Sequence, residues 1–203
     1  MTPNLRKKLK PSLSHKFFSR PAPQVAPDLL GCLLIRRWEG QRLAGLIVEL
    51  EAYQGVDEQA CHARAGKTAR NEVMFGEPGR AYVYFTYGMH WMLNLVCEAE
   101  GVPAAVLIRA IKPVEGLEVM RKLRPTLAGE PGWLNGPAKL TQALAIGREH
   151  NGVDVCSEEG GLWVENGVSV PEGDVRTSPR IGIGYAPEPW LSLPWRWLWE
   201  ARM

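Results

Sequence analysis

The run from Ala81 to Val96, AYVYFTYGMHWMLNLV, constrains the fold of this chain more than any other segment. It combines aromatic and branched side chains, which favour strands, with a glycine at position 88 in its middle. A tight turn at that glycine would divide the run into the two antiparallel strands of a hairpin. The sequence therefore predicts a sheet that contains a hairpin, with Tyr87 at the turn.

Other strand-like segments also follow one another without regular helical crossovers. They are Cys32 to Trp38 and Leu43 to Tyr53, joined by a polar turn at Glu39, Gly40 and Gln41, then Pro103 to Ile111, and later short strands with Gly punctuation, including RIGIGY from Arg180 to Tyr185. This order favours an α+β fold, a single compact domain around a curved, mostly antiparallel sheet with flanking helices.

Three short helices are expected, each with a proline near its start. The first would begin at Pro27 and include Leu29 and Leu30. The second would follow Pro113, because Val114, Leu117, Met120 and Leu123 recur on one helical face. The third would begin at Pro137, carry Leu140, Ala143 and Leu144 on its buried side, and end by Gly147.

The length of 203 residues suits one domain with a sizeable core. Residues 1–23 are basic and contain prolines, so we expect a loosely held arm, with the domain itself at 24–203. No apolar run approaches the roughly 20 residues of a membrane span, and no apolar signal core follows the first basic residues. A soluble protein of the cytoplasm, or of the nucleus in a eukaryote, is expected.

The four cysteines lie far apart, and none forms a C-x-x-C pair. This spacing argues against a zinc site or a disulfide framework and fits a reducing compartment. We therefore predict no bound metal and no cofactor. The cysteines are Cys32, Cys61, Cys97 and Cys156.

The net charge is only +2, but basic residues cluster in two segments. Such clusters can neutralise phosphates, and they can equally form a solvated basic surface, so charge alone leaves both interpretations open. The first segment contains Lys7, Lys8, Lys10, Lys16 and Arg20, and the second contains Arg64, Lys67, Arg70 and Arg80.

The strand from Leu43 to Tyr53 carries two carboxylates on one face. Side chains alternate along a strand, so Ile47, Glu49, Glu51 and Tyr53 are expected on one face, and Leu46, Val48, Leu50 and Ala52 on the other face, in the core. Glu49 and Glu51 could form the floor of a site or an ordinary exposed face. The alternation alone does not distinguish the two carboxylates.

Aromatic and histidine residues are expected near the same strand end. A loop from Tyr53 brings His62 within reach, and Tyr82 and Tyr84 share one face of a later strand. A tyrosine at a hairpin tip, such as Tyr87, is exposed and could act as a wedge. Enzymes that act on a base remove it from the stack and hold it between aromatic faces, and wedge residues help to distort the duplex.

These residues belong to strings that resemble the alkyladenine (3-methyladenine) DNA glycosylases, the mammalian-type enzyme and its bacterial relatives. The strings occur in order with compact spacing and span nearly all of the chain beyond the N-terminal arm. They are VELEAYQG, HAR, RN, MF, PG, YVY, YGM and NL, then LIRAIKPVEGL from Leu107, NGPAKL from Asn135 and RIGIG from Arg180.

The resemblance implies an enzyme that flips a damaged purine from duplex DNA and hydrolyses its N-glycosidic bond, leaving an abasic site. Glu51 matches the general base that activates water. Tyr53 and His62 match the aromatics on either side of the flipped base, and Tyr84 matches the third wall. Asn94 matches the residue that excludes the amino group of guanine. The implied fold is related to a formyltransferase C-terminal domain.

The resemblance also implies contacts around the base. Tyr87 matches the side chain that fills the gap in the duplex, and Arg109 matches an arginine that positions the water or a phosphate. Met89 and Met74 resemble residues that pack in the minor groove, and Arg70 belongs to the basic segment expected on DNA.

Lys139 falls in the first turn of the helix predicted at Pro137, where the helix dipole opposes a cation. Together with the resemblance, this position favours a phosphate contact. No lysine is placed for a Schiff base, so a monofunctional glycosylase is expected. The alternatives are a non-catalytic lesion-binding module and a hydrolase of RNA or nucleosides, and the expected assembly is a monomer on double-stranded DNA.

Three regions depart from the family pattern. The N-terminal arm and the segment from Cys156 to Gly173 match no motif. The C-terminal run holds four of the eight tryptophans between Trp190 and Trp199. We expect this run to dock its aromatics on the body of the protein.

Overall fold

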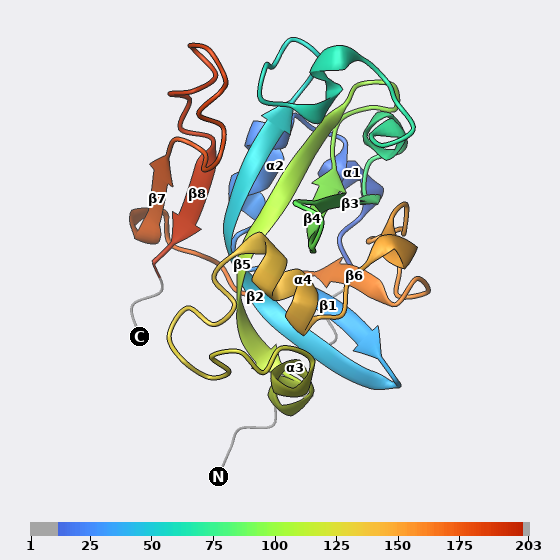
Figure 1. The fold of residues 1–203 in the computed structure, drawn as a ribbon, viewed down its shortest axis with the longest axis vertical. Helices are drawn as coiled ribbons and strands as arrows, with labels where there is room; N and C mark the ends of the chain where they lie inside the picture. Colours follow the sequence, from blue (N-terminus) through green and yellow to red (C-terminus); the bar gives the residue numbers. More distant parts are fainter. Residues whose placement is uncertain (1–11, 201–203) are drawn as a thin grey trace.

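In the computed structural model, which describes residues 12–200, eight strands form one sheet, and every strand pair in it is antiparallel. The order is β3-β4-β5-β2-β1-β6, and β8 joins β2 and β7 beside this path (Figure 1). The strands are β1 (Leu33–Trp38), β2 (Gln41–Gln54), β3 (Ala81–Thr86), β4 (His90–Val96), β5 (Ala104–Glu115), β6 (Leu162–Glu165), β7 (Val175–Ser178) and β8 (Arg196–Trp199). The predicted α+β fold with a mostly antiparallel sheet is confirmed.

The helices of the described residues are short and flank the sheet. The α-helices are α1 (His15–Phe18), α2 (Ala22–Leu29), α3 (Leu117–Leu123) and α4 (Pro137–Ala143). The 3-10 helices are η1 (His62–Ala65), η2 (Glu72–Phe75), η3 (Arg148–His150) and η4 (Glu172–Asp174). No helix in this part of the chain is both long enough and apolar enough to cross a membrane.

The long strand β2 changes partner halfway along its length. Gln41 to Leu46 pair with β1, Glu49 to Glu51 pair with β8, and β5 runs along the other edge. Figure 1 shows β2 and β5 side by side through most of the length of the molecule. The register of the two strands shifts between Ile47 and Glu49, so Val48 is an extra residue on β2. Such a bulge bends a strand and redirects its side chains.

This bulge corrects the predicted alternation. Ile47 was expected on the face of the two glutamates, but it is fully buried in the core with Leu50 and Ala52. Leu46 and Val48, expected in the core, are only partly buried. After the bulge the predicted alternation holds, and Glu49 and Glu51 share a face. Before the bulge the prediction is wrong, because the extra residue Val48 exchanges the two faces of the strand.

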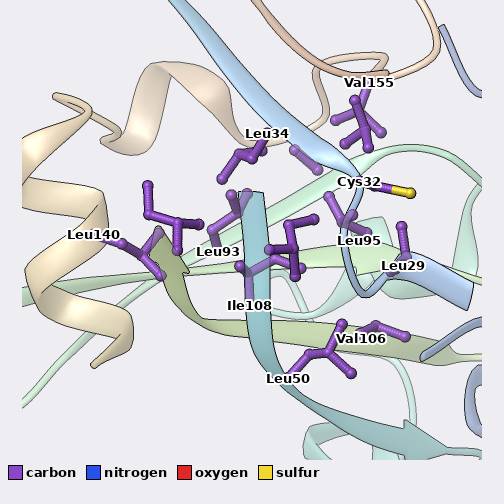
Figure 2. Packing of buried hydrophobic residues seen from close by; sticks show 14 of the residues in the cluster. Leu29, Cys32, Leu34, Leu50, Leu93, Leu95, Val106, Ile108, Leu140 and Val155 are labelled. Atoms are coloured by element: carbon purple, nitrogen blue, oxygen red, sulfur yellow. The ribbon is translucent and has the colours of Figure 1, made fainter. Parts of the chain in front are cut away.

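The main core lies on one face of the sheet, where α2 and α4 pack. Figure 2 shows Leu29 of α2 and Leu140 of α4 beside side chains of the sheet. The sheet contributes Leu34, Leu50, Leu93, Leu95, Val106 and Ile108 to this cluster, all without exposed surface. On the opposite face, Tyr82, Val96 and Ala105 of the sheet form a second, smaller buried cluster with Ala63 of η1 and Met74 of η2.

The first helix differs from its predicted bounds. Helix α2 begins at Ala22 after Pro21, and Pro27 lies inside it. Its buried residues Ala22, Val25, Ala26 and Leu29 recur at helical spacing, so the apolar stripe begins before Pro27. The prediction took Pro27 for the start because proline is common in a first turn.

The predicted start of the second helix was wrong. Pro113 and Val114 belong to the end of β5, and α3 begins after Gly116. Gly116 has a φ of 77°, and a Cβ at this position would lie 2.4 Å from Leu43 Cδ2. A glycine is required here because the chain turns sharply in contact with β2.

The two ends of the described chain pack on the sheet. Phe18 is fully buried in the main core, so residues 12–23, expected to be loosely held, contact the body. Residues 1–11, with Lys7, Lys8 and Lys10, lie outside the described part. At the other end, Trp195, Trp197 and Trp199 pack against the main core, as expected of the Trp-rich run.

Candidate active site

The site is organised around one row of residues across the sheet. Tyr82 pairs with Asn94, Asn94 with Leu107, and Leu107 with Glu51. Directly paired residues of an antiparallel ladder have their side chains on the same face. The row therefore brings residues of β3, β4, β5 and β2 to one place on the face opposite the main core.

A cavity of about 310 Å³ lies on this face. Its volume falls at the low end of small-molecule sites, roughly 300–1,000 Å³. Aromatic rings dominate its wall, and one guanidinium, from Arg109, enters it. The lining residues with chemical interest are Tyr53, His62, Met74, Tyr82, Tyr84, Tyr87, Asn94, Arg109, Ile181 and Tyr185.

Glu51 lies immediately behind this wall, because the three groups that bind its carboxylate all belong to lining residues. Its Oε1 accepts the backbone N–H of Ile181 at 2.7 Å and faces Arg109 Nη1 at 3.2 Å. Its Oε2 accepts the hydroxyl of Tyr53 at 2.9 Å. The side chain has no exposed surface. A carboxylate oxygen has two lone pairs, so among the described residues Oε2 retains one unused acceptor position.

Burial raises the pKa of Glu51 above its ordinary value, although Arg109, the Ile181 N–H and the Tyr53 hydroxyl lower it. The sequence could not decide between these opposing effects. Burial also raises the pKa of Tyr53 well above its ordinary value, and the charge of Glu51 adds to this shift. Tyr53 therefore remains a hydroxyl donor near neutral pH.

The two glutamates differ in their surroundings. Glu49 Oε1 accepts Arg109 Nε at 2.8 Å and Arg196 Nε at 2.7 Å. Glu49 borders a second hollow, of about 470 Å³, rather than the aromatic cavity. Glu49 binds two guanidiniums, whereas Glu51 also accepts hydrogen bonds from the Tyr53 hydroxyl and the Ile181 amide. Because Tyr53 and Ile181 both line the aromatic cavity, Glu51 is the glutamate that lies next to it.

His62 is set by its aromatic neighbours. Its Nδ1 lies 3.0 Å from the Tyr82 hydroxyl, and its ring meets the Tyr84 ring edge-to-face, with centroids 4.5 Å apart. Although part of His62 is exposed, burial of the ring against these side chains, followed by the charges of Arg70 and Arg64, lowers its pKa to about 4. The imidazole is therefore neutral near pH 7.

Asn94 is the polar group of the inner wall. It is 4% exposed, and its Nδ2 donates to the backbone oxygen of Tyr82 at 3.1 Å. This bond fixes the orientation of the amide at the cavity. Asn94 lines the same cavity as Tyr53, His62 and Tyr84, and its role toward guanine stays a prediction.

The β3–β4 hairpin has the predicted exposed tip. Tyr87 is 81% exposed with a φ of 52°, and Met89 is 67% exposed. Tyr87 also borders the cavity mouth. Met74 differs from the prediction: it lies in η2, is 2% exposed and forms part of the inner wall. A buried Met74 cannot pack in a DNA groove.

The two predicted phosphate contacts lie on separate elements. Arg70 is exposed, its guanidinium lies 5.3 Å from the centroid of the Tyr84 ring, and its Nη2 donates to the Phe85 backbone oxygen at 3.4 Å. Lys139 lies in the first turn of α4, as expected, and its Nζ donates to the Gly132 oxygen at 3.4 Å. Their contacts with DNA stay predictions.

The sequence missed the role of the segment RIGIGY, which forms turns rather than a strand. Arg180 is 5% exposed and pairs with the fully buried Glu58. Its guanidinium lies 4.7 Å from the centroid of the Tyr53 ring. Ile181 then supplies its N–H to Glu51. A charged residue among glycines and isoleucines was the available signal, but its partners lie far away in the chain.

One group of potential metal ligands lies outside this site. The ligand atoms of His15, Asp154 and Cys156 lie within 4.8 Å of one another. His15 Nε2 and Asp154 Oδ2 already contact each other at 3.1 Å. The positive charge of Arg80 acts on both Asp154 and Cys156, which opposes a bound cation.

Comparisons with known proteins agree with this geometry. The sequence profile of the methylpurine-DNA glycosylase family matches residues 16–203. A Methanocella arvoryzae protein named as a candidate 3-methyladenine DNA glycosylase is 51% identical over 186 residues, 92% of this chain and 91% of that protein. Similarly named proteins from Burkholderia lata and Carboxydothermus hydrogenoformans are 46% and 51% identical, over 91% and 84% of this chain and 86% and 88% of their own lengths.

Proposed function

Because the chain belongs to the methylpurine-DNA glycosylase family, we propose that it flips damaged purines out of duplex DNA and cleaves their N-glycosidic bonds with a water activated by Glu51. The chain is a DNA glycosylase, a hydrolase of DNA repair. The proposal concerns the substrate, including 3-methyladenine as in the names of its relatives, and the mechanism. We also propose that the protein acts as a monomer.

The observation that carries the mechanism is the position of Glu51 directly behind an aromatic cavity. Tyr53, Arg109 and Ile181 hold the carboxylate, and they also line the cavity. The unused acceptor position on Oε2 is where a water could donate its proton. We assign general-base catalysis to Glu51 on this geometry.

The reaction requires a nucleophile and charge stabilisation at C1′ of the sugar. The water oxygen forms a bond to C1′, its proton passes to Glu51, and the bond between C1′ and the base nitrogen breaks with its electron pair on the base. The transition state resembles an oxocarbenium ion, so a nearby carboxylate also stabilises its positive charge. A cationic alkylated purine leaves as a neutral base and needs no further proton.

The wall of the cavity suits such a cationic ring. Tyr53, Tyr84 and His62 present aromatic surfaces, and aromatic faces attract cations. Because the pKa of His62 is lowered to about 4, the imidazole adds no positive charge that would repel the substrate. Asn94 supplies the polar group with which the pocket can reject the exocyclic amino group of guanine.

The surface around the cavity mouth suits a distorted duplex. We propose that Tyr87 enters the space of the flipped nucleotide, with Met89 beside it in the minor groove. Exposed apolar side chains that insert at base steps are a known means of distorting DNA. Arg70 and Lys139 are proposed to contact phosphates, which would make binding weaken as salt increases.

The test is single-turnover excision of hypoxanthine and 3-methyladenine from duplex DNA by the wild type and Glu51→Gln. Loss of excision with DNA binding retained is expected. The matched control is Glu165→Gln, which also removes a buried carboxylate, 4% exposed and paired with Arg42, but outside the cavity. This control should excise as the wild type does.

Other outcomes have definite meanings. Unchanged excision by Glu51→Gln would contradict the role of Glu51. Binding without excision of any lesion by the wild type would favour the lesion-binding module. Excision from RNA or nucleosides in preference to duplex DNA would favour a hydrolase of RNA or nucleosides.

A further inference from the structure

We propose that Glu49 is a positioning residue for the reaction: its carboxylate, shared between Arg109 and Arg196, holds the guanidinium of Arg109 against Glu51. This inference rests on the proposed function, in which Glu51 activates the water. It assigns a task to the second glutamate of the strand and to the C-terminal strand β8.

The four side chains form a continuous chain of ion pairs in which the two glutamates are buried and the two arginines partly buried. Arg196 Nε contacts Glu49 Oε1 at 2.7 Å, and the same oxygen receives Arg109 Nε at 2.8 Å. Arg109 then uses its other end, Nη1, to face Glu51 Oε1 at 3.2 Å. Because a guanidinium is planar and rigid, fixing its Nε also fixes the direction of Nη1.

The backbone explains why Arg109 can bridge the two glutamates. The strand register skips Arg109, since Glu49 pairs with Ala110 while Leu50 pairs with Ile108. Val106 and Ile108 belong to the main core while Leu107 lines the cavity, so strand alternation places Arg109 on the cavity face. The register irregularity follows Arg109 and returns Ile111 to the core.

Burial makes this chain of charges sensitive to the loss of one member. The side chains of Glu49, Arg109 and Arg196 are 3%, 12% and 20% exposed. Two carboxylates balance two guanidiniums, with Glu51 as the fourth member. Without the charge of Glu49, the two guanidiniums would share one carboxylate, and Arg109 would lose its anchor at Nε.

The charges around Glu51 set the expected pH effect. Arg109 faces it from β5, Glu49 and Tyr53 from β2, Arg196 stands beside it on β8, and Tyr84 interacts from β3, together with the Ile181 N–H. The negative charge of Glu49 raises the pKa of Glu51, whereas Arg109 lowers it. Arg109 has the larger effect of the two, so release of Arg109 in a Glu49 variant should raise the pKa of Glu51.

The experiment measures the pH dependence of single-turnover excision of 3-methyladenine from duplex DNA. This cationic base needs no proton to leave, so the acid limb of the profile reports Glu51. For Glu49→Gln we expect a plateau rate about 10- to 100-fold below the wild type, as for displaced catalytic groups, and an acid limb shifted to higher pH, because Arg109 no longer faces Glu51.

Arg196→Gln provides a second variant with a shift in the same direction. It leaves Glu49 with Arg109 as its remaining cation among these side chains, so Arg109 is drawn toward Glu49 and away from Glu51. The acid limb should then move to higher pH. A purely structural role would change stability without moving the limb, as we expect for the control Glu165→Gln.

The outcomes separate this inference from the proposed function. A wild-type rate and limb in Glu49→Gln, or a lower plateau with a limb that is unmoved or moved to lower pH, would overturn the positioning role while Glu51→Gln remained inactive. An inactive wild type or an active Glu51→Gln would instead refute the proposed function. Unfolding in denaturant is measured for each variant, and Arg196→Gln decides the matter if Glu49→Gln does not fold.

Discussion

The hydroxyl of Tyr53 donates to Oε2 of Glu51 at 2.9 Å, while the ring of Tyr53 lines the aromatic cavity. The two residues stand two positions apart on β2 and therefore share a face. One strand end thus supplies a surface for a base and the carboxylate proposed to act on its bond. This arrangement ties the position of the bound ring to that of Glu51.

The tip of the hairpin can be tested without disturbing the fold. Tyr87 is 81% exposed, so Tyr87→Ala should leave the unfolding free energy within about 0.5 kcal/mol of the wild type. Excision in single-turnover reactions should slow, more for a lesion in a stable base pair than in a mismatch. Val114→Ala, an exposed residue of β5, is the control. Equal rates for all lesions would remove Tyr87 as the wedge.

The inner wall can be tested at Asn94. Replacing Asn94 by serine shortens a side chain that lines the cavity and removes the hydrogen bond from Nδ2 to the backbone oxygen of Tyr82. We expect Asn94→Ser to release guanine or 7-alkylated guanine faster than the wild type. Excision of hypoxanthine, which has no exocyclic amino group, is the internal reference. Failure to gain any release of guanine bases would contradict a steric role.

The protonation of His62 can be followed by NMR of its ring. Its titration midpoint should lie at about 4 in the folded protein and near 6.5 in denaturant. Because the folded-state pKa is lowered, the ring becomes charged only as the pH falls through that lower value. Arg70→Ala should raise the midpoint, since Arg70 is one of the two cations that lower it. A folded-state midpoint at the denaturant value would show that burial and these cations have no net effect.

The buried Glu51 should make stability depend on pH. Its pKa is raised in the folded state, so the folded protein binds the proton more tightly than the unfolded chain. As the pH rises from 4.5 through the raised value, the unfolding free energy of the wild type should fall relative to that of Glu51→Gln. The change is about 1.4 kcal/mol per unit of pKa shift. Denaturant unfolding of both proteins against pH measures it, and a constant difference would contradict the raised pKa.

Arg180 should be important for stability although it is remote from the proposed wedge. Arg180→Met would leave the buried carboxylate of Glu58 without its cationic partner and remove the guanidinium that covers the Tyr53 ring. Breaking a buried pair costs about 3–5 kcal/mol. The surface pair of Arg37 and Glu158 is the control, where Arg37→Met should cost about 0–1 kcal/mol. Comparable losses in the two variants would show that the burial of Arg180 has no special effect.

Local features of the sequence predicted much of this architecture. The hairpin with Tyr87 at its turn, the shared face of Glu49 and Glu51, and the helix at Pro137 all follow from nearby residues. Strand propensity, alternation and proline geometry act over a few positions, so they can be read directly.

The rest depends on partners far along the chain. The bulge at Val48 arises where β2 exchanges β1 for β8, and no local pattern marks that exchange. Met74 was placed in a DNA groove because the family resemblance does not specify burial. The tasks of Arg180 and Ile181 depend on contacts with β2 across about 130 positions of sequence, which neither periodicity nor composition encodes.

The late position of these partners has a consequence for synthesis. Glu51 lies in the first part of the chain, whereas Ile181 and Arg196 follow near its end. Synthesis proceeds from the N-terminus, and a domain generally folds as a unit. A nascent chain that already contains β2, β3, β4 and β5 still lacks the amide that binds Glu51 and the strand that covers Glu49. The active arrangement therefore forms only after residues up to Arg196 have been synthesised, and shorter chains released earlier would be unable to excise a base.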